Sequence, residues 1–292
     1  MTKKDNLKLH FFGGARVVTG VCFMLEIGEQ RILIDCGLFQ GEAAMEKKNS
    51  EALPFDPASI NAVIISHSHL DHIGRLPQLI ANGFKGPIFA TLPTIDFTRL
   101  ILEDSVKVLA EKAERAGVLP LFGQEEVNRV MEYFVAIDYY QPAKAAEGVS
   151  FIFREAGHIL GSAIIELRIK SQESGKKEET TIVFSGDLGN PPMPLLRAPD
   201  FMTEADYVII ESTYGDRNHE PASTCQEVIE NAIEDTVAKN GVLLIPSFAM
   251  ERTQQLLYHL NNLAESHRIP RVPIFIDSPL AIKITQVYKK YP

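Results

Sequence analysis

Residues 61–72, NAVIISHSHLDH, decide how this sequence is interpreted. The apolar run NAVIIS, at 61–66, is typical of a short strand buried on both faces of a sheet. Three histidines and an aspartate follow it directly, within residues 67–72. Imidazole and carboxylate groups are the ligands that zinc and similar divalent metals prefer. The stretch therefore predicts a buried strand that ends in a metal-binding loop.

The spacing of these side chains suits two neighbouring metals rather than one. His67, His69 and Asp71 would share one side of the chain if it stayed extended. The start of the helix predicted over 73–83 turns His72 away from them. The alternative is a surface loop that happens to be rich in histidine, but a buried strand has no reason to end in such a loop.

Two more candidate ligands follow later predicted strands. His158 comes after VSFIFRE at 149–155, and Asp187 comes directly after TTIVFSG at 180–186. A glycine precedes each of them, which allows the backbone to approach a crowded centre. Each residue taken alone is more often a structural histidine or a turn aspartate, so their interpretation as ligands depends on the first cluster.

Asp35 is a further carboxylate at the end of a predicted strand, RILID at 31–35. One interpretation is that it orients a ligand histidine from behind. The other is that it is a plain turn residue, and the sequence by itself favours neither.

The pattern of predicted strands and helices changes near residues 191–199, where prolines cluster. Before this point short strands alternate with turns and helices, including a long helix predicted from Thr94, as its cap, to about Ala116. After it, strands are predicted over 205–211, 242–248 and 272–278. Helices separate these strands, which is typical of a parallel, three-layer α/β unit. We therefore expect an α/β protein with domains over 1–198 and 199–292.

The composition of the 292 residues excludes several classes of protein. At 45% hydrophobic and 23% charged residues, it is that of an ordinary folded chain. No apolar run reaches the ~18 residues of a membrane-spanning helix, and no signal peptide is visible. Three isolated cysteines argue against a disulfide framework, so we expect a protein of the reducing cytoplasm with no membrane partner. The net charge of −9 does not indicate a nucleic-acid binder, so metal ions and a local groove would have to attract a polyanion.

The sequence HSHLDH at 67–72 resembles the H-x-H-x-D-H signature of the metallo-β-lactamase fold. Asp35, His158 and Asp187 follow in the order expected for other motifs of that family. The resemblance implies an αββα sandwich whose members are hydrolases with a dinuclear centre, usually of zinc.

Longer motifs resemble one branch of that fold, the β-CASP family. This branch includes RNA-processing nucleases related to the cleavage and polyadenylation endonuclease. The motifs are GGARVVTG (13–20), DCGLFQG (35–41), GHILGSA (157–163), SGDLGN (185–190), ESTYG (211–215), IPSFAMER (245–252) and DSP (277–279). The resemblance implies that residues 199–292 are part of a parallel α/β cap domain that β-CASP proteins insert into the sandwich.

The sequence departs from the family at its end. In the β-CASP family the chain returns from the cap to the sandwich and supplies one further metal ligand and a histidine that donates a proton. Here the sequence ends at Tyr291-Pro292, inside the expected cap, so the resemblance implies a chain truncated at its C-terminus. The histidines that follow the metal motifs, at 219, 259 and 267, are interpreted as surface or structural residues.

The resemblance also implies a role for each candidate residue. One zinc is assigned to His67, His69 and His158, and a second to Asp71 and His72, with Asp187 bridging the pair. The implied reaction is hydrolysis of RNA phosphodiester bonds by a hydroxide that bridges two zinc ions in the complete protein. Asp71 would also orient the nucleophile, Glu211 would hold the absent proton donor, and Asp35 would orient a ligand. Single-stranded RNA would lie between sandwich and cap against Ser247, Arg252 and Ser278, for which helix capping and solvation are the alternatives.

Two other functions stay open at this point. A thioester or lactam hydrolase of the same fold would explain the metal ligands but not Glu211-Ser212-Thr213-Tyr214-Gly215 or the added α/β unit. A non-catalytic RNA-binding subunit is the second alternative. It suits this chain taken alone, whose activity is expected to be impaired or absent. Homodimer formation is also left open.

Overall fold

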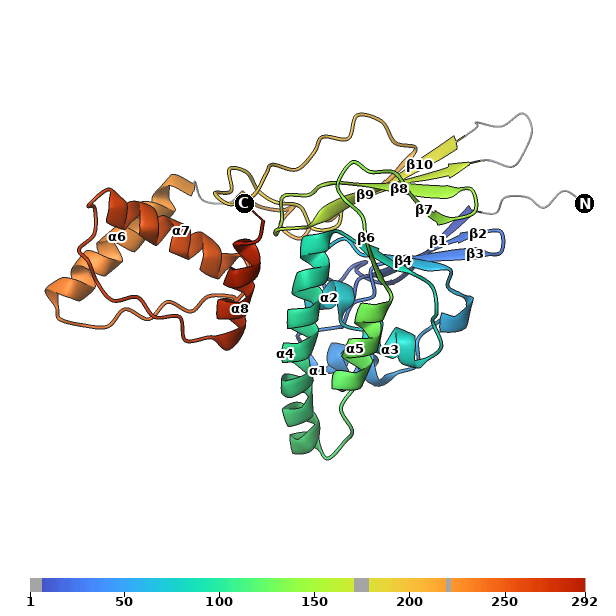
Figure 1. The fold of residues 1–292 in the computed structure, drawn as a ribbon, viewed down its shortest axis with the longest axis horizontal. Coiled ribbons are helices and arrows are strands. Elements are labelled where there is room, and N and C mark those ends of the chain that lie inside the picture. Colours follow the sequence, from blue (N-terminus) through green and yellow to red (C-terminus); the bar gives the residue numbers. More distant parts are fainter. Residues whose placement is uncertain (1–6, 171–178, 219–221, 292) are drawn as a thin grey trace, which may run out of the picture.

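The computed structural model describes residues 7–170, 179–218 and 222–291. It holds two β-sheets, a group of helices against the first sheet, and a helical C-terminal region to one side (Figure 1). The strands are β1 (Leu7–Gly13), β2 (Cys22–Ile27), β3 (Gln30–Ile34), β4 (Ala62–Ile64), β5 (Ile88–Ala90), β6 (Phe134–Ala136), β7 (Ala143–Ala146), β8 (Val149–Glu155), β9 (Ala163–Lys170), β10 (Glu179–Phe184) and β11 (Tyr207–Ile209). The helices are α1 (Ala43–Glu46), α2 (Leu70–Ile73), α3 (Leu76–Ala81), α4 (Leu92–Ala116), α5 (Gln124–Glu132), α6 (Ala222–Ala238), α7 (Arg252–Glu265) and α8 (Pro279–Tyr288), with short 3-10 turns at Lys47–Ser50 and Pro57–Ser59.

The first sheet has the order β1-β2-β3-β4-β5-β6. Its strand β4 is buried along its whole length and pairs in parallel with β3 and β5. The prediction of a doubly buried strand before the histidines is therefore confirmed. Alternate residues point to opposite faces, so Val63 packs toward the helices while Ala62 and Ile64 pack toward the other sheet.

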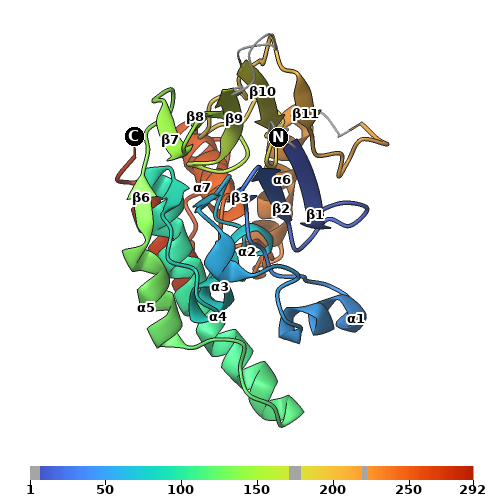
Figure 2. The same cartoon turned by 90° about the vertical axis from the view of Figure 1, so that its right-hand side faces the viewer.

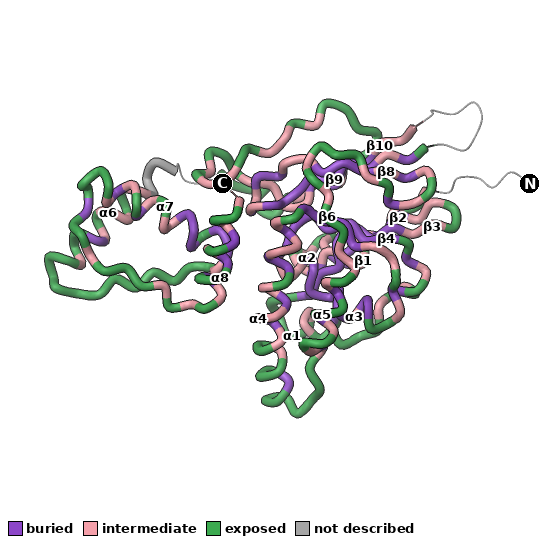
Figure 3. Tube along the Cα trace, viewed as in Figure 1, coloured by how far each residue is buried: buried purple, intermediate pink, exposed green. Residues whose placement is uncertain are grey.

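The second sheet, with the order β11-β10-β9-β8-β7, lies against that other face. Between the sheets the core is built from aliphatic and aromatic side chains such as Ile32, Ile34, Phe151, Phe153 and Ile165. Figure 2 shows the layers, with the second sheet on one side of the first sheet and α3, α4 and α5 on the other. Figure 3 shows that the most buried segments gather where the two sheets meet.

Two of the predicted helices form with shifted ends. The helix predicted over 73–83 begins later, as α3, and includes Pro77 in its first turn. The long helix begins at Leu92, and its cap is Thr91 rather than the predicted Thr94. The Thr91 hydroxyl accepts the hydrogen bond from the Thr94 backbone N–H, so Thr94 is already inside the first turn.

The C-terminal region differs from its prediction. The strand predicted over 205–211 does form, as β11, but it pairs in parallel with β10 and so extends the second sheet. The segments predicted as strands over 242–248 and 272–278 have no assigned strand, and Leu244 and Phe275 are 86% and 87% exposed. A strand forms only with a hydrogen-bonded neighbour, and none pairs with these segments among the residues that the structure describes. The predicted boundary between 198 and 199 remains a prediction.

Helix α8 fastens the C-terminal region to the rest of the molecule. Its Ile284 and Val287 are buried in one cluster with Phe97 of α4 and Ile159. At the end of the helix, the Lys290 ammonium lies 3.1 Å from a carboxylate oxygen of Asp96. None of the described helices is long and apolar enough to span a membrane.

Strand-end loops of both sheets meet at one edge of the sandwich. The backbone N–H groups of Cys36 and Leu38 donate to the carbonyl oxygens of His72 and Leu70, at 2.7 and 3.0 Å. Gly37 lies between them, and a Cβ atom there would be 1.5 Å from the Asp71 carbonyl oxygen. The loop after β3 and the histidine-rich loop after β4 are therefore in direct backbone contact, which requires glycine at position 37.

We expect Gly37→Ala to lower the free energy of unfolding by about 3 kcal/mol or more, because the added methyl group must push the two loops apart. Gly241→Ala is the matched control, since a Cβ atom there would meet its nearest neighbours at an ordinary 3.5 Å. Chemical denaturation of both variants measures the difference. Equal stability of the two variants would show that the loops do not need this close approach.

Candidate metal centre

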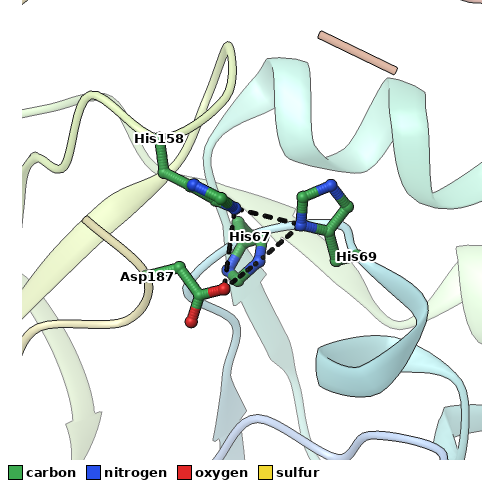
Figure 4. Close-up of side chains that lie close together, drawn as sticks. All are labelled: His67, His69, His158 and Asp187. Atoms are coloured by element: carbon green, nitrogen blue, oxygen red, sulfur yellow. Dashed lines mark hydrogen bonds and ion pairs between the residues drawn. The ribbon is translucent and has the colours of Figure 1, made fainter. Parts of the chain in front are cut away.

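Three imidazole rings converge where the loops meet (Figure 4). The Nδ1 atom of His69 lies 3.1 Å from the Nε2 atom of His67 and 3.1 Å from the Nε2 atom of His158. His67 and His69 come from the loop after β4, while His158 comes from the loop after β8. With one carboxylate oxygen of Asp187, these nitrogens form a group whose atoms all lie within 4.8 Å of one another.

The spacing of the nitrogens fits a shared cation. His69 Nδ1 carries at most one proton, yet it faces two other ring nitrogens at hydrogen-bonding distance. Nitrogen ligands at about 2.0–2.1 Å around a tetrahedral zinc would themselves be roughly 3.3 Å apart. The donor set of three imidazoles and one carboxylate is the kind that zinc binds. The four residues could therefore hold a metal ion.

The two carboxylate oxygens of Asp187 face two different groups of side chains. Its Oδ2 lies 3.7 Å from His67 Nε2 and 3.6 Å from His158 Nε2. Its Oδ1 lies 3.4 Å from His72 Nε2, which is also 3.9 Å from Asp71 Oδ2. The structure thus brings all six predicted metal ligands together, with Asp187 between the two groups.

Asp35 is buried behind this centre, with 1% of its surface exposed. Its Oδ2 accepts a hydrogen bond from His72 Nδ1 at 2.8 Å, and its Oδ1 accepts one from the Ser66 backbone N–H at 2.8 Å. Asp35 also has a positive φ of 60°, in the left-handed region. Its side-chain contacts are those of a carboxylate that orients a histidine from behind, which is one of the two alternatives that the sequence left open.

The histidines of the centre differ in the direction of their pKa shifts, which is downward for His67, His69 and His158 and upward for His72. Burial holds the pKa of His67 well below its usual value and lowers the pKa of His69 to about 3. Burial likewise lowers the pKa of His158. These three rings are therefore neutral at pH 7, which is the state that binds metals.

Carboxylates surround His72 and reverse this effect. Burial opposes a charge on His72, but the charge of Asp35 and hydrogen bonds to Asp187 and Asp35 raise its pKa well above the usual value. Burial alone would raise the pKa of Asp187, yet its hydrogen bond with His72 and the charge of that ring bring it to about 2. Burial raises the pKa of Asp71. His72 therefore carries a proton that partly balances the buried carboxylates.

Glu211 contacts the loop that carries Asp187. Its Oε1 accepts a hydrogen bond from the Leu188 backbone N–H at 3.0 Å, and its Oε2 accepts one from Thr213 at 3.1 Å. Its own backbone N–H donates to the Ser185 hydroxyl at 3.0 Å. Glu211 therefore ties the start of the segment after β11 to the residues on both sides of Asp187.

The three predicted substrate contacts lie in different surroundings. Ser247 and Arg252 line an open cavity of about 620 Å³ together with Phe248. The charge of Arg252 is also one of the smaller influences on His158, whose pKa is lowered mainly by burial. The Ser278 hydroxyl accepts a hydrogen bond from the Ala281 N–H, 3.2 Å away, and so caps α8, as its alternative interpretation predicts.

The two described histidines that follow the metal motifs lie outside the cluster. His259 is half-buried, with its Nδ1 3.1 Å from the Gln226 side chain, and His267 is exposed. His219 lies outside the described residues.

Two serines that support the ligands were not singled out from the sequence. The Ser66 hydroxyl lies between Asp35 and His67. The Ser162 hydroxyl accepts the backbone N–H of His158 at 3.0 Å. Both serines lie next to or within the motifs that carry the ligands, and that position is the signal that could have found them.

Comparisons with known proteins show which family the chain is similar to. Residues 24–175 match the model of a metallo-beta-lactamase superfamily domain, and residues 253–292 match that of a Beta-Casp domain. Ribonuclease TTHA0252 of Thermus thermophilus is 40% identical over 96% of this chain and 60% of its own length. An RNase J-like protein of Methanocaldococcus jannaschii is 34% identical over 97% of this chain and 61% of its own length.

A plant protein is also similar. Cleavage and polyadenylation specificity factor subunit 3-I of Arabidopsis thaliana is 32% identical over 98% of this chain and 40% of its own length. The chain spans less than two thirds of each of these three relatives. Because the first family model covers more than half of the chain and the second covers its end, the chain belongs to the β-CASP branch of the metallo-beta-lactamase superfamily.

Proposed function

We propose that the protein is a zinc-dependent ribonuclease that hydrolyses phosphodiester bonds of single-stranded RNA in the cytoplasm. The convergence of His67, His69, His158 and Asp187 at one edge of the sandwich carries this proposal. The names of the similar proteins, among them a ribonuclease, support the choice of RNA as substrate. The similarity reaches both the sandwich and the start of the Beta-Casp domain, which favours a nuclease over a thioester or lactam hydrolase.

Six side chains would hold the metals. His67, His69 and His158 would bind one zinc, Asp71 and His72 would bind a second, and Asp187 would contribute one oxygen to each. Zinc in these positions would supply Lewis-acid polarisation of water and of the phosphate oxygens. The neutral imidazoles of the first group need lose no proton to bind, whereas His72 must give up its Nε2 proton.

The remaining residues would orient the reactants. Asp71 has a partly buried carboxylate beside His72, so it would accept a hydrogen bond from the attacking water and fix its direction. Glu211 would hold the Asp187 loop in place through Leu188. Asp35 would hold the His72 ring from behind. Arg252 and Ser247, on the wall of the cavity in the C-terminal region, would contact RNA phosphates.

We expect His69→Ala to abolish RNA cleavage without unfolding the protein. The reason is that His69 Nδ1 is the atom that faces both other ring nitrogens of the first group. Loss of a ligand should lower metal affinity by more than the roughly 10–100-fold that an outer-shell partner contributes. Metal content by elemental analysis and cleavage of labelled RNA measure the effect.

The matched control is His259→Ala, which removes a half-buried imidazole outside the cluster. It should keep both metal content and cleavage. Parent-level cleavage by folded His69→Ala protein would overturn the metal assignment.

We expect Glu211→Gln to slow turnover more than it weakens RNA binding. The amide can accept only one of the two backbone hydrogen bonds, from Leu188 or Thr213, so the loop of Asp187 loosens. Single-turnover kinetics separate kcat from the dissociation constant. Glu204→Gln, at an exposed position, should leave both parameters at the parent value. An unchanged kcat for Glu211→Gln would remove Glu211 from the site.

We expect Arg252→Ala to weaken RNA binding and to reduce the salt dependence of that binding by about one phosphate contact. Binding measured at several salt concentrations gives the slope. Arg271→Ala removes an exposed arginine outside the cavity lining and should leave the slope unchanged. If the two variants show the same slope, Arg252 does not contact the phosphates.

A further inference from the structure

Ser66 is a buried hydroxyl with no role in the proposed function. Only 1% of its surface is exposed, and it directly precedes His67. Its Oγ lies 2.7 Å from Asp35 Oδ2 and 3.0 Å from His67 Nδ1. The same oxygen is 3.3 Å from His72 Nδ1. A single hydroxyl therefore touches the carboxylate behind the centre and one imidazole from each group of ligands.

The proton of this hydroxyl can point in only one direction. An ionised carboxylate only accepts hydrogen bonds, so the Ser66 proton is donated to Asp35. Ser66 Oγ can then only accept a hydrogen bond from His67, which places a proton on His67 Nδ1. A neutral imidazole has one proton, so the Nε2 atom of His67 keeps its lone pair.

That lone pair faces the metal centre. His67 Nε2 is the atom that lies 3.1 Å from His69 Nδ1 and 3.7 Å from Asp187 Oδ2. Asp35 acts directly on the second group of ligands, through its hydrogen bond with His72 Nδ1. Among the described residues, it is Ser66 that links Asp35 to the first group.

The backbone of Ser66 is fixed on both sides, so the hydroxyl has little freedom to turn away. Its N–H donates to Asp35 Oδ1 at 2.8 Å, and its carbonyl oxygen accepts from the Ala163 N–H at 2.8 Å. A Cβ atom at Gly186 would come within 2.9 Å of the Ser66 Cβ, so the loop before Asp187 packs directly against this serine.

We propose that Ser66 is a positioning residue, through which Asp35 sets the orientation of His67. Its hydroxyl keeps the proton of the neutral His67 ring on Nδ1, and the Nε2 lone pair is thereby directed at the first metal. The inference rests on the metal centre of the proposed function. One carboxylate would then set the orientation of a ligand in each of the two groups, directly for His72 and through one hydroxyl for His67.

The tautomer of His67 tests this relay without any substitution. In metal-free protein at pH 7.5, two-bond proton–nitrogen NMR correlations of the histidine rings show which nitrogen carries the proton. His67 should be protonated on Nδ1 and bare on Nε2. A His67 ring protonated on Nε2 would overturn the proposal, whether or not the protein binds metal.

Metal affinity tests the consequence of the relay. Ser66→Ala should weaken binding of Zn²⁺ at the first group by about 10–100-fold, as outer-shell partners of ligand histidines do. It should also alter the visible absorption of Co²⁺ bound there. Competition with a chromophoric chelator measures the zinc affinity.

Ser68→Ala is the matched control. Ser68 is equally buried and lies in the same loop, but the one contact shown for its hydroxyl is with the Met250 sulfur, at 3.8 Å. Its zinc affinity and cobalt spectrum should match those of the parent. Parent-like affinity and spectrum in folded Ser66→Ala protein would contradict the relay.

The outcomes separate this inference from the proposed function. A parent protein that binds neither Zn²⁺ nor Co²⁺ would defeat the metal centre, and the His67 tautomer would then decide the relay alone. A parent that binds metal but does not cleave RNA would defeat the ribonuclease and leave the relay supported by the affinity difference. If Ser66→Ala protein does not fold, the tautomer in the parent decides.

Discussion

The architecture depends on a close approach of backbones at one edge of the sandwich. The loop after β3 is hydrogen-bonded along the histidine-rich loop after β4, and glycine at position 37 leaves room for the Asp71 carbonyl. A second approach joins the other two loops, because a Cβ atom at Gly189 would lie 1.8 Å from the Gly157 carbonyl oxygen. His158 and Asp187 belong to these loops. Side chains from distant parts of the sequence meet because their backbones are almost in contact.

The charges of the centre explain why it suits a cation. Asp35, Asp71 and Asp187 bring three carboxyl groups into a poorly solvated region, where an uncompensated negative charge is costly. Without a metal, the proton on His72 is the nearest compensating charge, which is why the pKa of this ring rises although burial opposes it. A cation between Asp71, His72 and Asp187 would take the place of that proton. The histidines of the first group, in contrast, are already in the neutral state that a metal requires.

Patterns of neighbouring residues predicted the individual strands and helices that depend on those neighbours, but not which strands pair. The apolar run at 61–66 identified a strand buried on both faces, and the histidine-rich cluster after it was the reason for interpreting His158 and Asp187 as ligands. The cap of the long helix was misplaced by one turn, although Pro93 allowed the earlier start, since proline is tolerated in a first helical turn. The segments at 242–248 and 272–278 were predicted as strands from their composition, but pairing is a property of the neighbour and not of the segment.

The role of Asp35 could not be predicted from neighbouring residues either, because it depends on residues that are distant in the sequence. Its partners, Ser66 and His72, lie 31 and 37 positions further along the chain, so no nearby residue distinguishes a turn from an orienting carboxylate. The C-terminal region adds another long-range contact, because Met250 approaches Ser68 inside the ligand loop. Met250 is buried in the same cluster as Phe97 of α4 and Ile284 of α8. Met250 therefore packs between α4 and α8 on one side and the loop that carries His67 and His69 on the other, a contact between residues about 180 positions apart that no local pattern in the sequence indicates.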